Sequence, residues 1–423
     1  MSSGKRLVVV GLGYIGLPTA VVLADSGWQV MGVDVSDRTI DYVRKGKVPF
    51  VEPGFDEVLK ASVDSGRLTV QKDTPKADIY IVCVPTPFKE GHELDSTYID
   101  AAVDAIIPQL EGDELMVLES TSPPGTTEAM AERVLAARPD LSMDGSDGRP
   151  IVYFAHAPER VLPGRIMIEM RENDRIIGGL TPEATKRVAE LYESFNKGRV
   201  ITTDARTAEM AKLTENAFRD VNIAFANELS VLCEKLGIDV FELIELSNHH
   251  PRVNILQPGT GVGGHCIAID PWFIVSTVPE ESKLIHMARD VNDAKPYWVL
   301  DHLESALNEK NIESGAKIAL LGLAYKPNID DLRESPSLKI AKEAAEKYPQ
   351  HTILAVEPYV EAAPEAIAHY PNVRFASPEE AVADADVIVL QVAHDQFKDL
   401  KPQANANATI LDPIGLWHTI AEH

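Results

Sequence analysis

The chain has 423 residues, 45% of them hydrophobic, and a net charge of −25. This length predicts two or three domains, and the acidity argues against nucleic-acid or anionic-membrane partners. No run of about 18 apolar residues occurs, so we expect no membrane span. The three cysteines have no metal-ligand spacing and are odd in number, which favours a reducing cytoplasm and no metal site.

The first elements follow the pattern of a dinucleotide-binding domain. Residues 5–10 are apolar and β-branched, and Gly-x-Gly-x-x-Gly at 11–16 and a helical stretch at 17–26 follow directly. These glycines allow the tight turn, the approach of a pyrophosphate and close helix packing. A second strand, 29–34, ends in an acid that would bind a ribose hydroxyl and repel a 2′-phosphate, so we expect NAD rather than NADP. The expected cofactor residues in this region are Gly11, Gly13, Tyr14, Ile15, Gly16, Asp34 and Arg38.

Three further strands lead into polar segments. Strands at 77–84 and 115–118 run towards Thr86 and Thr121, which we expect at the cofactor edge, although each hydroxyl could instead cap a turn. A strand at 151–155 leads to Glu159, a candidate carboxylate for positioning water. The alternative for Glu159 is a surface salt bridge with Arg160.

The middle of the chain predicts one long amphipathic helix, because 199–236 lacks glycine and proline and repeats apolar residues at three- and four-residue steps. Lys212, Asn216 and Arg219 share one face of this helix and could dock an anion, with Lys212 available for acid–base work. The alternative is a solvated helix face. A helix of this length also suggests a dimer interface.

A glycine-rich loop follows the helix. It places four glycines in residues 259–264, then Cys266, then Asp270. Dense glycines let backbone N–H groups crowd against a ligand, so Cys266 is a candidate nucleophile beside a bound anion. The preceding histidines at 249 and 250 lack a third ligand at metal spacing. Arg252 is a candidate phosphate or sugar contact that could reach a neighbouring subunit.

The last third repeats the strand pattern at 317–321, 352–357 and 385–390, after a linking helix at about 295–310. Its first loop lacks Gly-x-Gly-x-x-Gly, so we expect a ligand other than NAD, with Lys326 and Arg333 bringing positive charge. The predicted fold class is therefore α/β, with two Rossmann-like doubly wound domains joined by a long central helix and a helical middle domain. The expected domains are 1–200 for NAD binding, 201–310 for the central helical part and 311–423 for the second ligand.

Over essentially its whole length the chain resembles the UDP-glucose/GDP-mannose dehydrogenase family of nucleotide-sugar 6-dehydrogenases. The motifs that carry the resemblance are Gly11-x-Gly13-x-x-Gly16, Pro85-Thr86-Pro87, Ser120-Thr121, Pro158-Glu159, the Lys212/Asn216 helix, the 259–270 loop and Lys326…Asp331-Leu332-Arg333. The segments 219–228, 250–259 and 261–274 are most similar to family members that act on UDP-N-acetyl-D-mannosamine. The departures are Thr260, where proline is expected, and Ala157, where relatives often carry cysteine.

The resemblance implies a four-electron oxidation of the sugar C6 alcohol to a carboxylate with two NAD. It implies that Lys212 or a water held by Asp270 is the base, that Cys266 forms a thiohemiacetal and then a thioester, and that Glu159 assists hydrolysis. Asn216 would stabilise developing negative charge, and residues 311–423 would bind the UDP-sugar. Independently of the resemblance, a cytoplasmic homodimer through the central helix is expected. The implied substrate contacts are Glu159, Arg160, Val161, Lys212, Asn216, Arg219, Asn222, His250, Arg252, Gly259, Gly263, Lys326 and Arg333, the last also near the cofactor.

Alternatives remain at this stage. A two-electron dehydrogenase of the 6-phosphogluconate or 3-hydroxyacid type has a similar architecture but needs no cysteine. A non-catalytic NAD-binding regulator would be expected to have lost some of Cys266, Lys212, Asn216 or Asp270, and all four are present. Within the family, UDP-GlcNAc and UDP-glucose 6-dehydrogenases are the rivals, and a substrate contact by His265 is left open.

Overall fold

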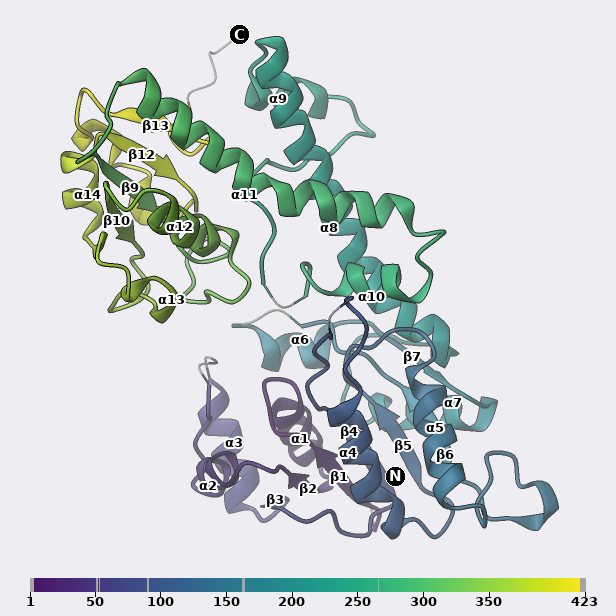
Figure 1. Cartoon of the computed structure of the whole chain (residues 1–423). Helices are drawn as coiled ribbons and strands as arrows, with labels where there is room; N and C mark the ends of the chain where they lie inside the picture. The colour runs from purple at the N-terminus through teal and green to yellow at the C-terminus, as the bar shows by residue number, and fades with distance from the viewer. Residues whose placement is uncertain are drawn as a thin grey trace. The chain divides into compact units, whose positions relative to one another are not determined.

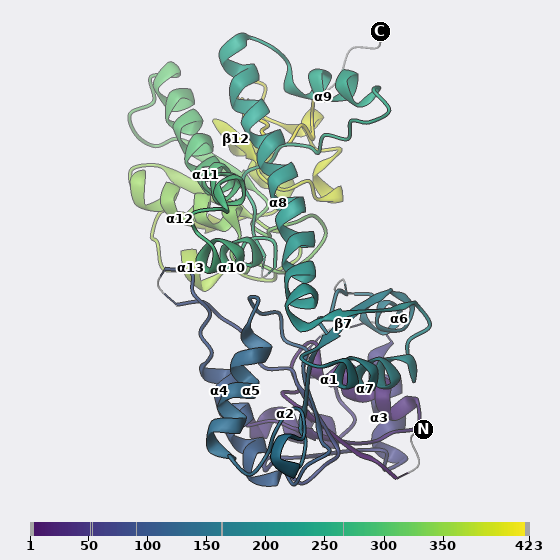
Figure 2. The ribbon, with the colours of Figure 1, turned by 90° about the vertical axis from the view of Figure 1, so that its right-hand side faces the viewer.

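The computed structural model describes residues 4–50, 52, 54–89, 91–161, 164–264 and 266–418. His265 therefore lies outside the described residues. The chain divides into two compact units, one up to Glu215 and one from Asn216 onwards. The division falls within a single helix, α8 (Ala205–Leu236), which Figure 2 shows as one long ribbon.

The first unit is built on an eight-stranded sheet in the order β3-β2-β1-β4-β5-β6-β7-β8. Its first six strands have the order of a dinucleotide-binding fold. All neighbours are parallel except β6 and β7, which are antiparallel. The strands are β1 (Arg6–Val10), β2 (Gln29–Val33), β3 (Leu68–Gln71), β4 (Ile79–Val82), β5 (Leu115–Leu118), β6 (Tyr153–His156), β7 (Arg175–Gly179) and β8 (Val200–Asp204).

Helices cover both faces of this sheet (Figure 1). Apart from α8, they are α1 (Gly16–Asp25), α2 (Asp37–Arg44), α3 (Phe55–Asp64), α4 (Thr97–Ile106), α5 (Thr126–Ala137), α6 (Ile166–Glu172) and α7 (Pro182–Glu193). Side chains of α1, α2, α3, α6 and α7 form one core with the strand residues that point to their face. Those of α4 and α5 form the other. Strands buried on both faces explain the continuous apolar runs in the sequence.

The second unit contains a parallel five-stranded sheet in the order β11-β10-β9-β12-β13. Its strands are β9 (Lys317–Leu321), β10 (Thr352–Val356), β11 (Val373–Phe375), β12 (Val387–Leu390) and β13 (Thr409–Leu411). Its helices are α9 (Val240–Asn248), α10 (Asp270–Thr277), α11 (Lys283–Glu309), α12 (Pro336–Lys347), α13 (Glu365–Ala368) and α14 (Pro378–Asp384). Helices α11, α12 and α13 pack on one face of the sheet, and α14 packs on the other.

The predicted fold class is confirmed: two doubly wound sheets and long helices between them in sequence. The predicted linking helix was too short, because α11 begins at Lys283 and continues through Pro296. A proline is normally tolerated in a helix's first turn, which is why the sequence suggested a start near 295. The strands β3, β7, β8, β11 and β13 were not predicted.

Candidate functional site

The glycine loop after β1 has the geometry of a dinucleotide cradle. A Cβ on Gly11 would lie 2.4 Å from the Cys83 carbonyl oxygen, and one on Gly16 would lie 1.9 Å from the Gly11 carbonyl oxygen. Gly13, in contrast, faces open space, because a Cβ at this position would have no atom within 4 Å. Tyr14 and Ile15 pack against the core of this face. The loop is therefore compact on its protein side and open where a pyrophosphate would approach the start of α1.

Asp34 holds this loop from the end of β2. Its carboxylate accepts the N–H of Leu12 at 2.8 Å and the N–H of Ser36 at 2.8 Å. Asp34 remains half-buried, so its remaining lone pairs can meet a ribose hydroxyl. Arg38, in the first turn of α2, is exposed and lies over the Tyr42 ring.

Thr86 and Thr121 follow the neighbouring strands β4 and β5, and both are half-buried. The Ser120 hydroxyl donates to the Val84 carbonyl oxygen at 2.7 Å and ties the two segments together. The carboxyl ends of adjacent parallel strands meet at one edge of a sheet, so the two threonines occupy the edge where ligands bind in such folds.

Glu159 is buried, with 7% of its surface exposed, and its partner is not the one considered from sequence. Its Oε2 lies 2.5 Å from Nη1 of Arg175, and its Oε1 accepts the N–H of Arg160 at 2.7 Å. The guanidinium of Arg160 instead pairs with Glu215 and donates to the Asp174 carbonyl oxygen. Val161 packs on the core beside them. The surface salt bridge between Glu159 and Arg160 is therefore not formed.

A second buried carboxylate, Glu119, lies next to this pair. It accepts hydrogen bonds from the Tyr192 hydroxyl at 2.9 Å, the Thr19 hydroxyl at 2.8 Å and the Cys83 thiol at 2.9 Å. Burial and then the charge of Glu159 raise the pKa of Glu119. Burial and the Glu119 charge also raise the pKa of Cys83 well above its usual value, as expected of an inert core thiol.

The predicted polar face of α8 changes from buried to exposed along the helix. Lys212 is 9% exposed, Asn216 is half-buried and Arg219 is exposed. The Asn222 side chain bonds to the preceding turn of its own helix, where its Nδ2 donates to the Phe218 carbonyl oxygen at 2.6 Å. Lys212 and Asn216 are thus one turn apart with little exposure, which a solvated helix face would not show.

Cys266 is exposed at the end of the glycine loop, and a turn leads from it into α10. Its carbonyl oxygen accepts the N–H of Asp270 at 2.8 Å and that of Ile269 at 3.1 Å. The Asp270 side chain is 3% exposed and accepts a hydrogen bond from Asn216 Nδ2 at 2.5 Å. The structure of the second unit thus brings Asn216 and Asp270 together, four residues from the exposed thiol.

Two of the loop glycines are required by close packing. A Cβ on Gly263 would lie 2.4 Å from the Glu334 carbonyl oxygen, and one on Gly264 would lie 2.8 Å from the Tyr325 ring. The N–H of Gly264 also donates to the Arg333 carbonyl oxygen at 3.1 Å. The N–H of Gly259 donates to Asn227 Oδ1 at 2.8 Å, and a Cβ on Gly259 would have nothing within 4 Å, so only its Cα side is open.

The segment that supports this loop carries the predicted positive charge. Arg333 forms a bidentate pair with Asp331, at 2.9 Å from Nε and 2.6 Å from Nη2, and this bond raises the pKa of Arg333. Burial, and then Asp331, raise the pKa of Tyr325. Charge on Cys266 would raise both pKa values further. Lys326 is half-buried beside them in sequence. His250 and Arg252 lie exposed in the turn after α9, where the Arg252 N–H donates to His250 Nδ1 at 3.3 Å.

The second sheet repeats the Asp34 arrangement with a different outcome. Glu357, after β10, accepts the N–H groups of Leu323 at 2.8 Å and Ala324 at 2.9 Å. However, His394 lies 3.1 Å from the same carboxylate, and both side chains are fully buried. Glu357 therefore cannot meet a ribose as Asp34 can, which agrees with the absence of the glycine motif from the loop.

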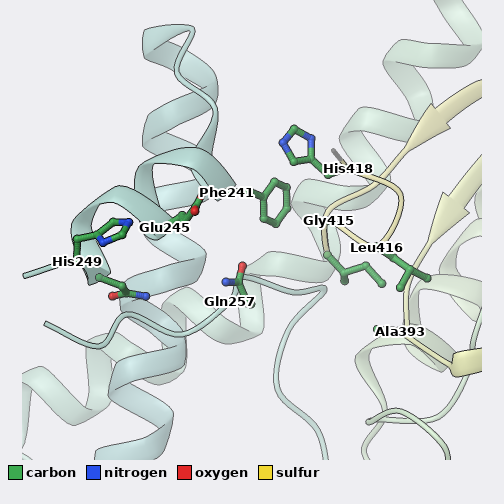
Figure 3. A pocket seen from close by; sticks show the side chains of 10 residues that line it. Phe241, Glu245, His249, Gln257, Ala393, Gly415, Leu416 and His418 are labelled. Carbon is green, nitrogen blue, oxygen red and sulfur yellow. The ribbon is translucent and has the colours of Figure 1, made fainter. Parts of the chain in front are cut away.

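A cavity of about 650 Å³ lies in the second unit. Figure 3 shows Phe241 of α9 directed towards Gly415 and His418 of the loop after β13, with Gln257 and Ala393 below them. None of the predicted site residues lines it. Among the described residues, no cluster of three or more His, Cys, Asp or Glu side chains could hold a metal ion. None of the helices in the described part of the chain combines the length and apolar character that a membrane span requires.

The sequence did not single out Arg175 and Glu119, which lie around Glu159 in the first unit, or Tyr325, which packs against Gly264 in the second. Glu119 directly follows β5, and Tyr325 lies in the loop that follows β9, so both stand at positions where ligand-edge residues are expected. Arg175 had no such signal, because β7 runs antiparallel to its neighbour β6.

Three family models match the chain in succession. Residues 5–196 match the NAD binding domain of the UDP-glucose/GDP-mannose dehydrogenase family, 206–294 its central domain and 319–418 its UDP binding domain. The chain is 49% identical to an NDP-N-acetyl-D-galactosaminuronic acid dehydrogenase of Ralstonia nicotianae, covering 98% of this chain and 96% of the relative. It is 48% identical to the UDP-N-acetyl-D-mannosamine dehydrogenase of Escherichia coli K12, covering 98% and 100%.

A solved structure of a UDP-D-ManNAc dehydrogenase from Pyrococcus horikoshii superposes with a TM-score of 0.85 at 39% identity, over 99% of this chain and 96% of that one. The glycine cradle closed by Asp34 fits the cofactor of an NAD binding domain. Sequence, fold and loop geometry agree over both units. The chain belongs to the UDP-glucose/GDP-mannose dehydrogenase family.

Proposed function

We propose that the protein oxidises the C6 alcohol of UDP-N-acetyl-D-mannosamine to a carboxylate in an NAD-dependent, four-electron reaction. The observation that carries the proposal is the exposed Cys266 at the end of a loop whose Gly263 and Gly264 leave no room for a Cβ. A two-electron dehydrogenase needs no such thiol. The chain is 48% identical in sequence to UDP-N-acetyl-D-mannosamine dehydrogenases, which supports UDP-N-acetyl-D-mannosamine as the substrate.

The chain's own residues take the following roles in this proposal. Lys212, or a water held by Asp270, removes the C6 hydroxyl proton, and the Cys266 thiolate attacks the aldehyde to form a thiohemiacetal. Two NAD molecules, bound one after the other, would each accept one hydride. Asn216 donates to the oxygen that gains negative charge and is kept in place by its bond to Asp270. Glu159 positions the water that hydrolyses the resulting thioester.

Binding is divided among three parts of the chain. We assign NAD to 1–200, the central helical part with the cysteine loop to 201–310 and the UDP-sugar to 311–423. For the cofactor we keep Gly11, Gly13, Tyr14, Ile15, Gly16, Asp34, Arg38, Thr86, Thr121 and Arg333. Substrate contacts include Arg160, Val161, Arg219, Asn222, His250, Arg252, Gly259, Gly263 and Lys326. The buried Glu357–His394 pair supports a ligand other than NAD at the second sheet.

The N-acetyl-D-galactosamine sugar nucleotide, UDP-GalNAc, is a second candidate substrate. The Ralstonia relative named for N-acetyl-D-galactosaminuronic acid is as similar, at 49% identity, as the mannosamine enzymes at 48%. The test offers the purified protein UDP-ManNAc, UDP-GalNAc, UDP-GlcNAc and UDP-glucose with NAD and follows NADH. Two NADH per UDP-ManNAc support the proposal. One NADH per sugar contradicts the thioester route, and turnover of another sugar alone contradicts the specificity.

We also propose a cytoplasmic homodimer through α8. The support is an exposed apolar stripe on this helix: Phe218 is 70% exposed, Phe225 51% and Leu236 71%. Phe218 and Phe225 are seven residues apart, so they share a face of the helix. Light scattering of Phe225→Asp should give a monomer. Tyr98→Asp on α4, at 49% exposure, is the matched control and should leave the dimer intact. Monomeric wild-type protein would refute the assignment.

A further inference from the structure

We propose that Arg175 is the positioning residue for Glu159 and that thioester hydrolysis depends on it, whereas the two oxidation steps do not. The inference rests on the proposed function, because it deepens the role given there to Glu159. It adds a residue from a different strand that does not itself touch the substrate.

The pairing follows from the one antiparallel junction of the first sheet. Strand β6 pairs with β7 so that Ala155 is opposite Gly179 and His156 is opposite Gly178. If this register is continued for three residues beyond His156, Glu159 falls opposite Arg175. Antiparallel strands also place the amino end of β7 at the carboxyl edge of β6, where ligands bind in this fold. Arg175, at the start of β7, therefore lies beside Glu159 in the segment that follows β6.

The guanidinium is held from several sides. Nη2 of Arg175 donates to the Met170 carbonyl oxygen at 3.0 Å, and its Cζ lies 5.3 Å from the Tyr192 ring centre and 5.7 Å from that of Phe195. Its side chain is 3% exposed. Burial opposes this charge, yet the carboxylates of Glu159 and Glu119 keep the pKa of Arg175 raised. Because an unpaired buried charge is costly, the guanidinium is held against its carboxylate partners.

Two carboxylates share this one cation unequally. Nη1 of Arg175 lies 2.5 Å from Glu159 but 3.9 Å from Glu119. Glu119 is instead supplied with donors by Tyr192, Thr19 and Cys83, and its pKa is raised by burial and by Glu159. Glu119 is thus surrounded by hydroxyl and thiol donors, and the closer contact of Arg175 is with Glu159.

The consequence is a Glu159 carboxylate fixed at both oxygens. Oε1 accepts the Arg160 N–H, and Oε2 forms an ion pair with Arg175 Nη1 at 2.5 Å, so the remaining lone pairs of this carboxylate can hold water in a set direction. Hydrolysis forms a C–O bond from that water, breaks the C–S bond to Cys266 and releases a proton as the carboxylate forms. Neither oxidation requires this water. Loss of Arg175 should therefore slow the last step selectively.

The experiment compares Arg175→Met and Arg175→Lys with the wild type by rapid mixing with NAD and UDP-ManNAc. We expect both variants to produce a burst of two NADH per active site, followed by turnover about 100-fold slower for methionine. Intact mass should show an adduct of the sugar nucleotide less four hydrogens, located on Cys266. Lysine keeps the charge without the fork, so we expect a smaller loss of turnover.

The matched control is Arg187→Met. Arg187 is an arginine of the same unit that lies 3.8 Å from the Tyr153 ring centre and pairs with Asp113, not with Glu159. It should leave the ratio of burst to turnover unchanged. Equal losses of burst and turnover in Arg175→Lys, or absence of the adduct, would overturn the inference even if Arg175→Met fails to fold. One NADH per sugar from the wild type would instead overturn the proposed function and this inference together.

Discussion

Replacing Gly263 by alanine is the sharpest test of the cysteine loop. The new Cβ would lie 2.4 Å from the Glu334 carbonyl oxygen and 2.8 Å from both Pro336 Cδ and Tyr325 Cβ. Bringing the first contact to 3.0 Å requires a shift of at least 0.6 Å, the difference between the two distances. The obstacles are mainly backbone and a proline ring, and Glu334 already has a φ of 49°, so the loop itself must move.

The displaced loop carries Cys266 three residues later. Overpacking of this kind costs about 1–3 kcal/mol of stability, and a displacement approaching 1 Å at a reacting group costs about 100-fold in rate. We therefore expect Gly263→Ala to lower the melting temperature and to reduce kcat by about 100-fold. Thermal unfolding and steady-state NADH formation measure the two effects.

Gly259→Ala is the control within the same loop. Its Cβ meets nothing within 4 Å, so the melting temperature and kcat should hold, and any loss of room for substrate should appear in KM. If Gly263→Ala kept wild-type kcat and melting temperature, close packing against Glu334 would not position the thiol. Equal falls in both variants would show that glycine is needed for chain flexibility instead.

Three further predictions concern buried polar groups. Burial lowers the pKa of Lys295 to about 7, so between about pH 7 and 10 only the unfolded chain holds that proton, and the free energy of unfolding rises with pH. Lys295→Met should remove this rise and add on the order of 3 kcal/mol to the free energy of unfolding at pH 7, as measured by urea titration. Arg289 donates to Asp220 at 2.7 Å in the interior, so Arg289→Met should lower the free energy of unfolding by about 3–5 kcal/mol in chemical denaturation. Adding Asp220→Asn should recover part of this stability, and a loss below about 1 kcal/mol would contradict the pairing. Glu209 accepts two N–H groups at the start of α5, at 2.7 and 2.8 Å, so Glu209→Ala should cost about 1–3 kcal/mol in thermal unfolding, and an unchanged melting temperature would refute this cap.

Much of the architecture was predictable because it is written in local patterns. Apolar β-branched runs marked most of the buried strands, and the glycine motif with Asp34 marked the first sheet's ligand edge. The helix carrying Lys212 and Asn216 was predictable from its periodicity and its lack of glycine and proline. The roles of these residues remain proposals.

The features that were not predicted share a physical reason: contacts between distant segments have little effect on the local sequence pattern. Strand β7 has the composition of its parallel neighbours, yet it runs antiparallel to β6. Helix α11 continues through Pro296, because tertiary packing of its flanking turns outweighs the cost of a missing N–H. Neither feature follows from the propensity of its own residues.

Sequence alone determined the two doubly wound sheets, the NAD motif and an isolated cysteine after dense glycines, because each depends on residues adjacent in the chain. Only the tertiary structure decided which side chains those residues meet. It paired Glu159 with Arg175 rather than Arg160, bonded Asp270 to Asn216 and buried Glu357 beneath His394. Such contacts depend on strand direction and on the packing of distant elements, which the order of residues within one segment does not specify.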